Sequence, residues 1–368
     1  MNASVQAPTK TLKLKLTTSV IDNRPIYVSG NFCDWVADID RFRMQQVAPG
    51  SYEYTFPAKV DLPENLEYKY TKGGWDHVEL DSEGTAPLNR SARPHQVEAI
   101  QDFVPHWREE GVSWSDALMP ITELLSQSYE IPQLGTSRRI QVLLPHDYYQ
   151  QPDRRYPTLY LTDAQNLFGE GSSYGNWRID RKLAVLAARC RANVILIAID
   201  HGDQERIQEF SPYDTNRHGK GKGRDFLKFI TNKLKPEIDT KYRTLPDRLN
   251  TGIGGSSLGG LLAAYAGLMH PLVFSKLMVF SPSLWLSPRI YFDAAHFFEP
   301  LENRMYLYGG EREGANTVKN LESLYQTLER QGYGYDRVRL RLQIDPFGKH
   351  TEARWGEEFP KALEWLYF

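Results

Sequence analysis

Apolar residues follow two different spacings along the chain, and the change lies near residue 106. Before it, apolar and polar residues alternate, as in residues 11–16 and 67–70. A period of two is the pattern of a strand with one buried face. Clusters of proline, glycine and asparagine interrupt these runs at short intervals. Short strands separated by regular turn signals are typical of an all-β sandwich, so we predict an immunoglobulin-like sandwich over residues 1–105.

The second half of the chain alternates nearly continuous apolar runs with helical patterns. The runs that indicate strands are residues 138–144, 158–161, 193–199, the segment before residue 257, and residues 275–280, 304–308 and 338–344. Helical spacing marks residues 177–188, 223–242, the segment after residue 257, and residues 315–331 and 352–367. This alternation predicts a mostly parallel sheet covered by helices on both faces. We therefore expect an α/β domain over residues 136–368.

Residues 106–135 are expected to connect the two domains. The segment 107–111 is polar, and Pro132 and Gly135 interrupt the later part. Within the connector we predict one short helix over residues 119–125. The domain boundary is placed near residue 106.

A glycine cluster holds the strongest candidate for chemistry. Residues 255–259 read Gly-Ser-Ser-Leu-Gly, a G-x-S-x-G motif between a predicted strand and a small-residue helix. In that context the motif is a sharp turn that exposes a strained nucleophilic serine. Glycine occupies both required places only if the motif is centred on Ser257, so Ser256 is a neighbour. A dinucleotide-binding G-x-G-x-x-G beginning at Gly252 fails, because Ser257 stands where its third glycine belongs.

A serine nucleophile needs a base and an orienting acid. In hydrolases with this motif the chain order is serine, acid, histidine, and three histidines follow Ser257: His270, His296 and His350. His270 ends the helix after the motif, where it can interact with the helix C-terminus, and His296 lies in an aromatic segment. His350 follows the last predicted strand and is the preferred base. The acid is expected in the loop 309–314, where spacing alone leaves both Glu311 and Glu313 open.

Five stretches of the second half resemble the esterase-D-like and enterochelin-esterase-like α/β-hydrolases, a group that includes feruloyl and acetyl esterases. They are residues 160–168, 255–260, 280–285, 310–314 and 349–355. The resemblance implies an α/β-hydrolase fold and selects Glu313 as the acid. It also implies an oxyanion hole formed by the backbone N–H groups of Leu258 and of Gln165 in the loop 163–165. Many relatives have His-Gly or Asp-Gly where this chain has Asp163-Ala164.

The first domain resembles carbohydrate-binding modules of the starch- and glycogen-binding kind. The resemblance rests on residues 27–35, 52–56, 67–75 and 89–90. It implies a glucan platform made by Trp35 and Trp75 with help from Lys69 and Asn89. The same tryptophans could instead pack in a core or between domains, since an aromatic face serves either purpose.

The net charge and the amino-acid composition limit the kinds of partner that the protein is expected to bind. The 368 residues carry a formal charge of −2, with 41% hydrophobic and 24% charged residues, so we expect no nucleic-acid or membrane partner. The first residues show no secretory leader, and Cys33 and Cys190 are far apart, so we expect free thiols and a cytoplasmic protein. No metal-binding motif is present, and no cofactor is expected. Residues 218–224 are basic and glycine-rich but lack the Gly-Lys-Ser/Thr of a phosphate-binding loop.

Two functions follow from these patterns. The preferred one is a serine carboxylesterase that uses Ser257, His350 and Glu313 on a small-molecule or saccharide ester. Acylated carbohydrates, feruloyl esters and siderophore-type lactones all fit. The alternative is a non-catalytic glucan-binding protein with a hydrolase-like scaffold. Hydrolysis of a simple activated ester distinguishes the two.

Overall fold

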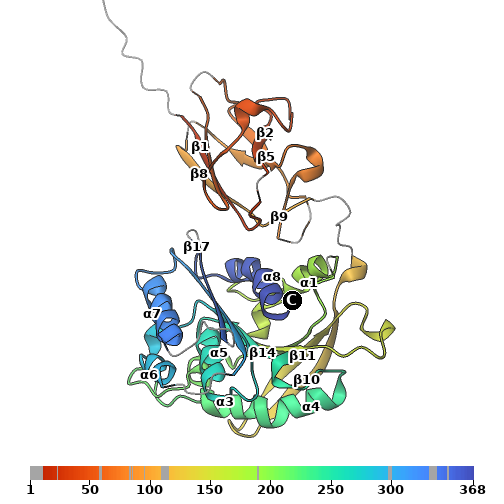
Figure 1. Cartoon of the computed structure of the whole chain (residues 1–368), viewed down its shortest axis with the longest axis vertical. Coiled ribbons are helices and arrows are strands. Elements are labelled where there is room, and N and C mark those ends of the chain that lie inside the picture. Colours follow the sequence, from red (N-terminus) through yellow and green to blue (C-terminus); the bar gives the residue numbers. More distant parts are fainter. Residues whose placement is uncertain are drawn as a thin grey trace, which may run out of the picture. The chain divides into compact units, whose positions relative to one another are not determined.

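The computed structural model describes residues 11–22, 24–57, 60–82, 84, 86–94, 96–108, 116–188, 190–296, 301–330, 338–345 and 348–368. The chain forms two compact units, Met1–Trp114 and Ser115–Phe368, which are coloured red to orange and orange to blue in Figure 1. The predicted connector is thus shared between the units, and its residues 109–115 lie outside the described part of the chain.

The first unit is built from short strands in two main sheets. One sheet has the order β3-β4-β1-β8 and the other the order β2-β5-β7, with a separate pair β6-β9. The strands are β1 (Lys13–Thr18), β2 (Tyr27–Gly30), β3 (Gln45–Ala48), β4 (Ser51–Thr55), β5 (Leu66–Thr71), β6 (Glu79–Leu80), β7 (Arg90–Ala92), β8 (Ala99–Val104) and β9 (His106–Trp107).

The core of this unit lies between the two main sheets. Leu14 and Leu16 of β1 are buried while the lysines between them are partly exposed, as the period of two predicts. They share one apolar cluster with Tyr68 and Tyr70 of β5. The predicted β-rich first domain is therefore confirmed.

The second unit contains one sheet of eight strands in the order β10-β11-β13-β12-β14-β15-β16-β17. Pairs β10–β11 and β11–β13 are antiparallel, and all later pairs are parallel. The strands are β10 (Ile121–Ile131), β11 (Thr136–Leu144), β12 (Thr158–Thr162), β13 (Ile195–Ile199), β14 (Thr251–Ser256), β15 (Lys276–Phe280), β16 (Asn303–Gly310) and β17 (Val338–Asp345).

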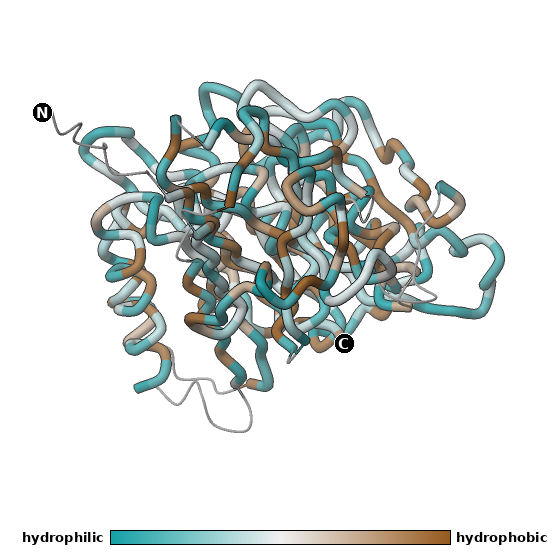
Figure 2. The backbone as a smooth tube through the Cα atoms, turned by 90° about the horizontal axis from the view of Figure 1, so that it is seen from above, coloured by the Kyte–Doolittle hydropathy of each residue, from teal (hydrophilic) through white to brown (hydrophobic). Residues whose placement is uncertain are grey.

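Helices cover both faces of this sheet (Figure 1). Helices α1 (Ile179–Ala188) and α8 (Glu352–Tyr367) contribute to one apolar cluster. The other cluster takes residues from α3 (Gly223–Phe229), α4 (Lys235–Lys241), α5 (Leu258–Met269), α6 (Arg289–Ala295) and α7 (Thr317–Arg330). Hydrophilic and hydrophobic stretches alternate along the peripheral helices in Figure 2, as expected for helices with one buried face. The predicted α/β-hydrolase architecture is confirmed.

The structure departs from the prediction at the start of this unit. The short helix predicted over residues 119–125 is wrong, because residues 121–125 belong to β10, an edge strand paired with β11, and residues 119–120 precede this strand. The register shifts between Leu124 and Ser126 and again between Ser126 and Tyr129. Each irregularity breaks the two-residue alternation, so the adjacent leucines resemble a helical face. Two short helices, α2 (Arg206–Phe210) and α6, were not predicted either.

Candidate active site

The candidate nucleophile stands at the turn between β14 and α5. Ser257 has φ 56° and ψ −114°, a conformation that side chains rarely adopt and that costs of order 1–3 kcal/mol. The turn places it at the carboxyl end of a central parallel strand, where ligands bind in open α/β sheets. Ser256 is instead the last residue of β14 and is buried.

The flanking glycines allow this turn because neighbouring atoms leave no room for side chains. A Cβ on Gly255 would lie 2.6 Å from Thr162 Oγ1, and one on Gly259 would lie closer still to the same oxygen. Thr162 ends the adjacent strand β12. The motif therefore has a steric origin: α5 begins in contact with the neighbouring strand.

His350 lies within hydrogen-bond reach of both Ser257 and Glu313. Nε2 of His350 lies 3.1 Å from Ser257 Oγ, and its Nδ1 lies 3.0 Å from Glu313 Oε2. The three residues follow β14, β16 and β17, whose carboxyl ends meet at one edge of the sheet. The histidine side chain is 43% exposed, whereas that of Glu313 is 1% exposed. This arrangement can move a proton between the serine and the histidine while the buried carboxylate orients the ring.

Further hydrogen bonds hold the acid in place. Glu313 Oε1 accepts from Ser281 Oγ at 2.6 Å and from the backbone N–H of Gly310 at 2.8 Å. Ser281 accepts in turn from Trp355 Nε1 at 2.8 Å, and the Trp355 ring meets His350 edge-on with centroids 4.8 Å apart. The sequence offered one signal for Ser281, because it falls in the family-like stretch 280–285.

The remaining candidates of the sequence lie elsewhere. Glu311 is exposed, and its backbone N–H donates to the Asp345 carbonyl. His270 caps the end of α5, where burial lowers its pKa, so the expected interaction of a cation with that helix end is disfavoured. His296 stacks on Phe292.

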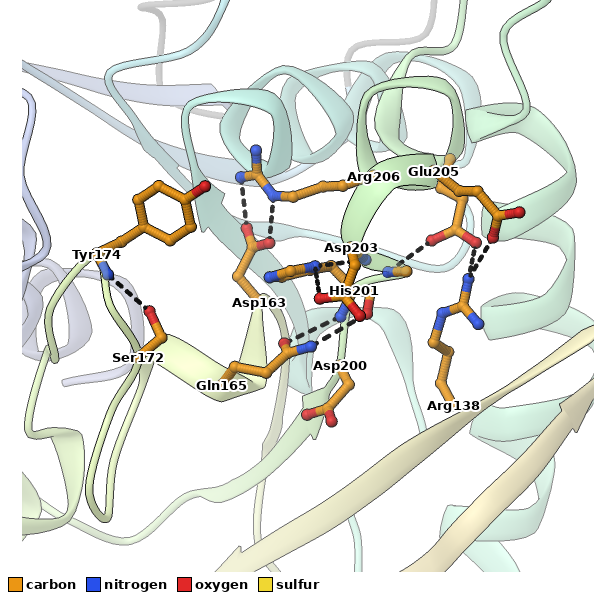
Figure 3. Close-up of polar contacts among 12 residues, drawn as sticks. Arg138, Asp163, Gln165, Ser172, Tyr174, Asp200, His201, Asp203, Glu205 and Arg206 are labelled. Carbon is orange, nitrogen blue, oxygen red and sulfur yellow. Dashed lines mark hydrogen bonds and ion pairs between the residues drawn. The ribbon is translucent and has the colours of Figure 1, made fainter.

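The loop after β12 faces the start of α5 and is the candidate second half of the oxyanion hole. Asp163 adopts a left-handed conformation, with φ 62° and ψ 42°, and is buried. Its carboxylate forms two hydrogen bonds with Arg206, at 2.5 and 2.9 Å. The Gln165 side chain bonds both backbone groups of His201, at 3.1 Å each (Figure 3). The loop that carries the predicted N–H of Gln165 is therefore anchored twice to residues 201–206.

Leu258 is the first residue of α5, and the first backbone N–H groups of a helix have no partner within it. Helix N-termini also favour negative charge. The predicted donor Leu258 therefore stands where an oxyanion can be stabilised, directly after the candidate nucleophile Ser257.

A cavity of about 510 Å³ opens beside Ser257 and His350. Most of the residues that line it have polar groups; beside Ser257 and His350 they are Asn166, Tyr174, His201, Asp203, Gln204, Arg206, Glu352 and Trp355. Glu352 accepts a hydrogen bond from Asn166 at 3.1 Å, and burial raises the pKa of its carboxyl group. No role for these pocket residues was predicted from the sequence. Asn166 and Glu352 lie in the family-like stretches 160–168 and 349–355, which were a signal for them, whereas Tyr174, His201, Asp203 and Gln204 belong to no motif.

The tryptophans of the second unit differ in environment. Trp355 lines the cavity, whereas Trp177 is buried and stacks on Phe280. Trp285 is exposed. Of these three tryptophans, only Trp355 is among the residues that line the cavity beside Ser257.

In the first unit, the structure brings Trp35 and Trp75 together at the surface. Their ring centroids are 6.2 Å apart at an interplanar angle of 46°, and Trp75 donates from Nε1 to the Trp35 carbonyl at 3.1 Å. Trp75 is 38% exposed. Lys69 bonds the Pro87 carbonyl, and Asn89 donates to Glu67 at 2.9 Å.

Within the described ranges, no group of three or more His, Cys, Asp or Glu side chains is arranged to hold a metal ion. No helix in the described part of the chain is long and apolar enough to span a bilayer.

Comparison with known proteins places the second unit in a family. Residues 131–366 match the Esterase family, whose description reads "Putative esterase". The chain is also similar to the ferri-bacillibactin esterase BesA of Bacillus subtilis (strain 168). The two are 29% identical over 206 residues, which cover 48% of this chain and 68% of BesA.

Solved structures show the same fold. The enterobactin esterase FES from Shigella flexneri aligns with a TM-score of 0.54 and 16% identity, covering 96% of this chain and 92% of FES. A ferulic acid esterase from Anaeromyces mucronatus aligns with a TM-score of 0.52 and 18% identity, covering 70% and 92% of the two chains. The likeness to FES spans both units, whereas the likeness to the ferulic acid esterase covers a smaller share of the chain.

Proposed function

The chain belongs to the Esterase family, and from that premise we propose that it is a serine carboxylesterase that works through an acyl-enzyme. One observation carries the proposal. Ser257 Oγ and His350 Nε2 are 3.1 Å apart, and His350 Nδ1 and Glu313 Oε2 are 3.0 Å apart. Both distances lie within hydrogen-bond reach, as the chemistry of an activated serine requires.

In the proposed mechanism, Ser257 Oγ attacks the ester carbonyl carbon while His350 Nε2 accepts the hydroxyl proton. Glu313 accepts the Nδ1–H hydrogen bond and stabilises the imidazolium that forms. Backbone N–H groups of Leu258 and of the loop 163–165 bind the oxyanion. His350 then protonates the departing alcohol. Water, deprotonated by His350, attacks the acyl-enzyme and releases the acid.

Replacement of the nucleophile tests this proposal. Ser257→Ala should abolish hydrolysis of p-nitrophenyl acetate and leave the melting temperature nearly unchanged. Ser256→Ala is the matched control, because it removes the same hydroxyl one residue earlier, where the side chain is buried in β14, and it should retain turnover. Undiminished turnover by purified Ser257→Ala would refute the assignment.

The cavity wall supports an ester with several polar groups. Carboxylates, amides and a guanidinium surround the space beside Ser257, and a few placed polar groups give a pocket its specificity. BesA is named as a ferri-bacillibactin esterase, FES as an enterobactin esterase and the Anaeromyces enzyme as a ferulic acid esterase. We therefore propose an acylated carbohydrate, a feruloyl-type ester or a siderophore-type lactone as the substrate. Comparing kcat/KM across these three ester classes and a plain alkyl ester tests it; equal values would contradict a polar specificity.

A second activity is proposed for the first unit. The adjacent Trp35 and Trp75 rings offer a surface on which glucose rings can stack. This candidate differs from the non-catalytic alternative, since it accompanies hydrolysis rather than replacing it. Lys69 and Asn89 already bond groups of their own unit, so the tryptophans carry the proposal.

Gel retardation in amylopectin tests glucan binding. Wild-type protein should be retarded, and Trp75→Ala should be retarded less, with unchanged hydrolysis of p-nitrophenyl acetate. Trp285→Ala is the control, since it removes an exposed tryptophan of the second unit. Absence of retardation for the wild type would exclude the platform.

A further inference from the structure

We propose that a second pocket in the catalytic unit binds a phosphate group. This cavity, of about 510 Å³, contains neither Ser257 nor His350. Its wall comes from the loop after α2, the first turns of α3 and the start of α6. Four basic side chains line it: Lys220, Arg224, Lys228 and Arg289.

Two arginines from different elements converge on one aromatic ring. The guanidinium carbon of Arg224 lies 6.0 Å from the centre of the Tyr213 ring, and that of Arg289 lies 5.8 Å from the same centre. Tyr213 is buried, and its hydroxyl donates to Asp293 at 2.6 Å. A ring fixed in this way holds both cations by their attraction to its face. The two positively charged guanidinium groups repel each other. An anion bound between them would be attracted to both and would offset this repulsion.

The acidic residues that line this pocket do not balance its basic residues, so the pocket keeps a net positive charge. Asp214 and Asp225 are the acidic residues that line the pocket, so four basic and two acidic groups leave an excess of two positive charges. Asp225 pairs with Lys228 at 3.1 Å, and Asp214 accepts from the Gly221 N–H. Asp293, which accepts the hydrogen bond from the Tyr213 hydroxyl, reduces the excess from two positive charges to one. Within the described residues, the guanidinium of Arg289 makes no ion pair or hydrogen bond, and Arg224 uses Nε on the Pro212 carbonyl.

The basic, glycine-rich loop is held in a defined shape. Thr215 and Gly219 exchange two backbone hydrogen bonds, and Lys222 and Gly223 bond Gln208 and Ser211. A Cβ on Gly221 would lie 2.6 Å from the Ser211 carbonyl oxygen, so the loop packs closely on the chain before it. Lys220 and Arg224 are thus presented from an anchored backbone. Although the sequence lacks a phosphate-binding loop motif, the tertiary structure adds Arg289 from a distant segment.

The geometry suits a tetrahedral oxyanion. Each guanidinium offers several N–H donors in a planar fork that matches phosphate oxygens, and such charge-assisted hydrogen bonds are stronger than neutral ones. Two forks that face one space from separate elements can bond different oxygens of the same ion. The lysines add attraction from the rim.

Binding of inorganic phosphate to the full-length protein tests the proposal. Melting temperature and titration calorimetry are measured with increasing phosphate at constant ionic strength, with sodium chloride as the replaced salt. We expect a saturable rise in melting temperature, because a ligand of the folded state stabilises it. Arg289→Gln should weaken phosphate binding about ten-fold or more, the equivalent of one hydrogen bond to a charged group.

Arg191→Gln is the matched control, because Arg191 is exposed and its guanidinium carbon lies 5.9 Å from the ring centre of Phe368. It removes the same charge and a similar ring contact, and phosphate affinity should be unchanged. Ser257→Ala should bind phosphate like the wild type, which separates this site from the esterase proposal. No stabilisation beyond that of chloride, or equal weakening by Arg191→Gln, would overturn the phosphate site.

Discussion

Glu311 and Glu313 stand two positions apart in one loop, yet their surroundings differ completely. The Glu313 carboxylate accepts hydrogen bonds from Ser281 and the Gly310 N–H and lies beside His350. Glu311 is exposed. The difference arises because neighbouring side chains of a tight loop point in different directions. The side chain of Glu313 points toward the His350 ring, and that of Glu311 is exposed.

Removal of the Glu313 charge should therefore reduce catalysis. Glu313→Gln keeps the shape of the side chain but favours the wrong histidine tautomer, and in a serine protease the corresponding change costs roughly 10⁴ in kcat. We expect a loss of roughly 10³–10⁴ in kcat with little change in KM, measured on p-nitrophenyl acetate. Glu311→Gln is the control and should stay within a few-fold of wild type. The reverse ranking would assign the acid to Glu311.

The buried carboxyl group of Glu352 should make the free energy of unfolding depend on pH. Burial raises the pKa of its carboxyl group above 4.5, the charge of Asp163 acts in the same direction, and His350 and Arg206 oppose it. The folded protein thus holds this proton more tightly than the unfolded chain. The free energy of unfolding should therefore fall as pH rises from 4.5 through the raised pKa, and the cost of the buried carboxylate is complete above it.

Glu352→Gln removes that cost and keeps an acceptor for Asn166. We expect a higher melting temperature than wild type at pH 7, with the difference disappearing as pH falls toward 4, where both side chains are neutral. Thermal unfolding followed by circular dichroism at several pH values measures it. A difference that does not vary with pH would contradict the role of the charge.

At the scale of elements, the contact between the start of α5 and the end of β12 defines the nucleophile turn. The steric account predicts that Gly259→Ala destabilises the protein by about 1–3 kcal/mol, the usual cost of overpacking. The nearest atom to the added Cβ is Thr162 Oγ1. The double variant Thr162→Ala/Gly259→Ala should therefore recover part of the lost stability in denaturant unfolding.

Gly74→Ala is the control for this pair, because an added Cβ there meets no atom within 4 Å. Its stability should match the wild type within about 0.5 kcal/mol, the usual range for surface changes. If Thr162→Ala gives no recovery, the limit at Gly259 is set by another neighbour.

At the scale of the whole molecule, the two units have separate apolar cores. Leu14, Tyr68 and their neighbours form one cluster that shares no residue with the clusters on either face of the large sheet. Units with their own cores can unfold independently. We predict two transitions in scanning calorimetry, with loss of esterase activity following only one of them. A single cooperative transition that removes activity and the first unit together would contradict this.

The sequence by itself determined the class of fold and supplied the candidate nucleophile and the candidate base. Apolar residues recur about every two residues in a strand and every 3.6 residues in a helix that buries one face. This spacing can be recognised in the sequence whatever the element packs against. Ser257 was recognisable because its turn imposes a local steric rule on Gly255 and Gly259. His350 followed from chain order, since the connections of this fold bring the ends of successive parallel strands to one edge.

Spacing along the chain left Glu311 and Glu313 open, and the family resemblance favoured Glu313, which the tertiary structure places beside His350. Only the tertiary structure decided that residues 121–131 form an edge strand and which side chains line the two pockets. Glu313 and His350 are 37 residues apart, and Asn166 and Glu352 are 186 apart. Contacts between residues so far apart in sequence cannot be predicted from a local pattern. Loop residues have no regular spacing, and the strands and helices that flank a loop determine where its side chains point. Arg224 and Arg289 likewise share one ring only after α3 and α6 have packed on the same face of the sheet.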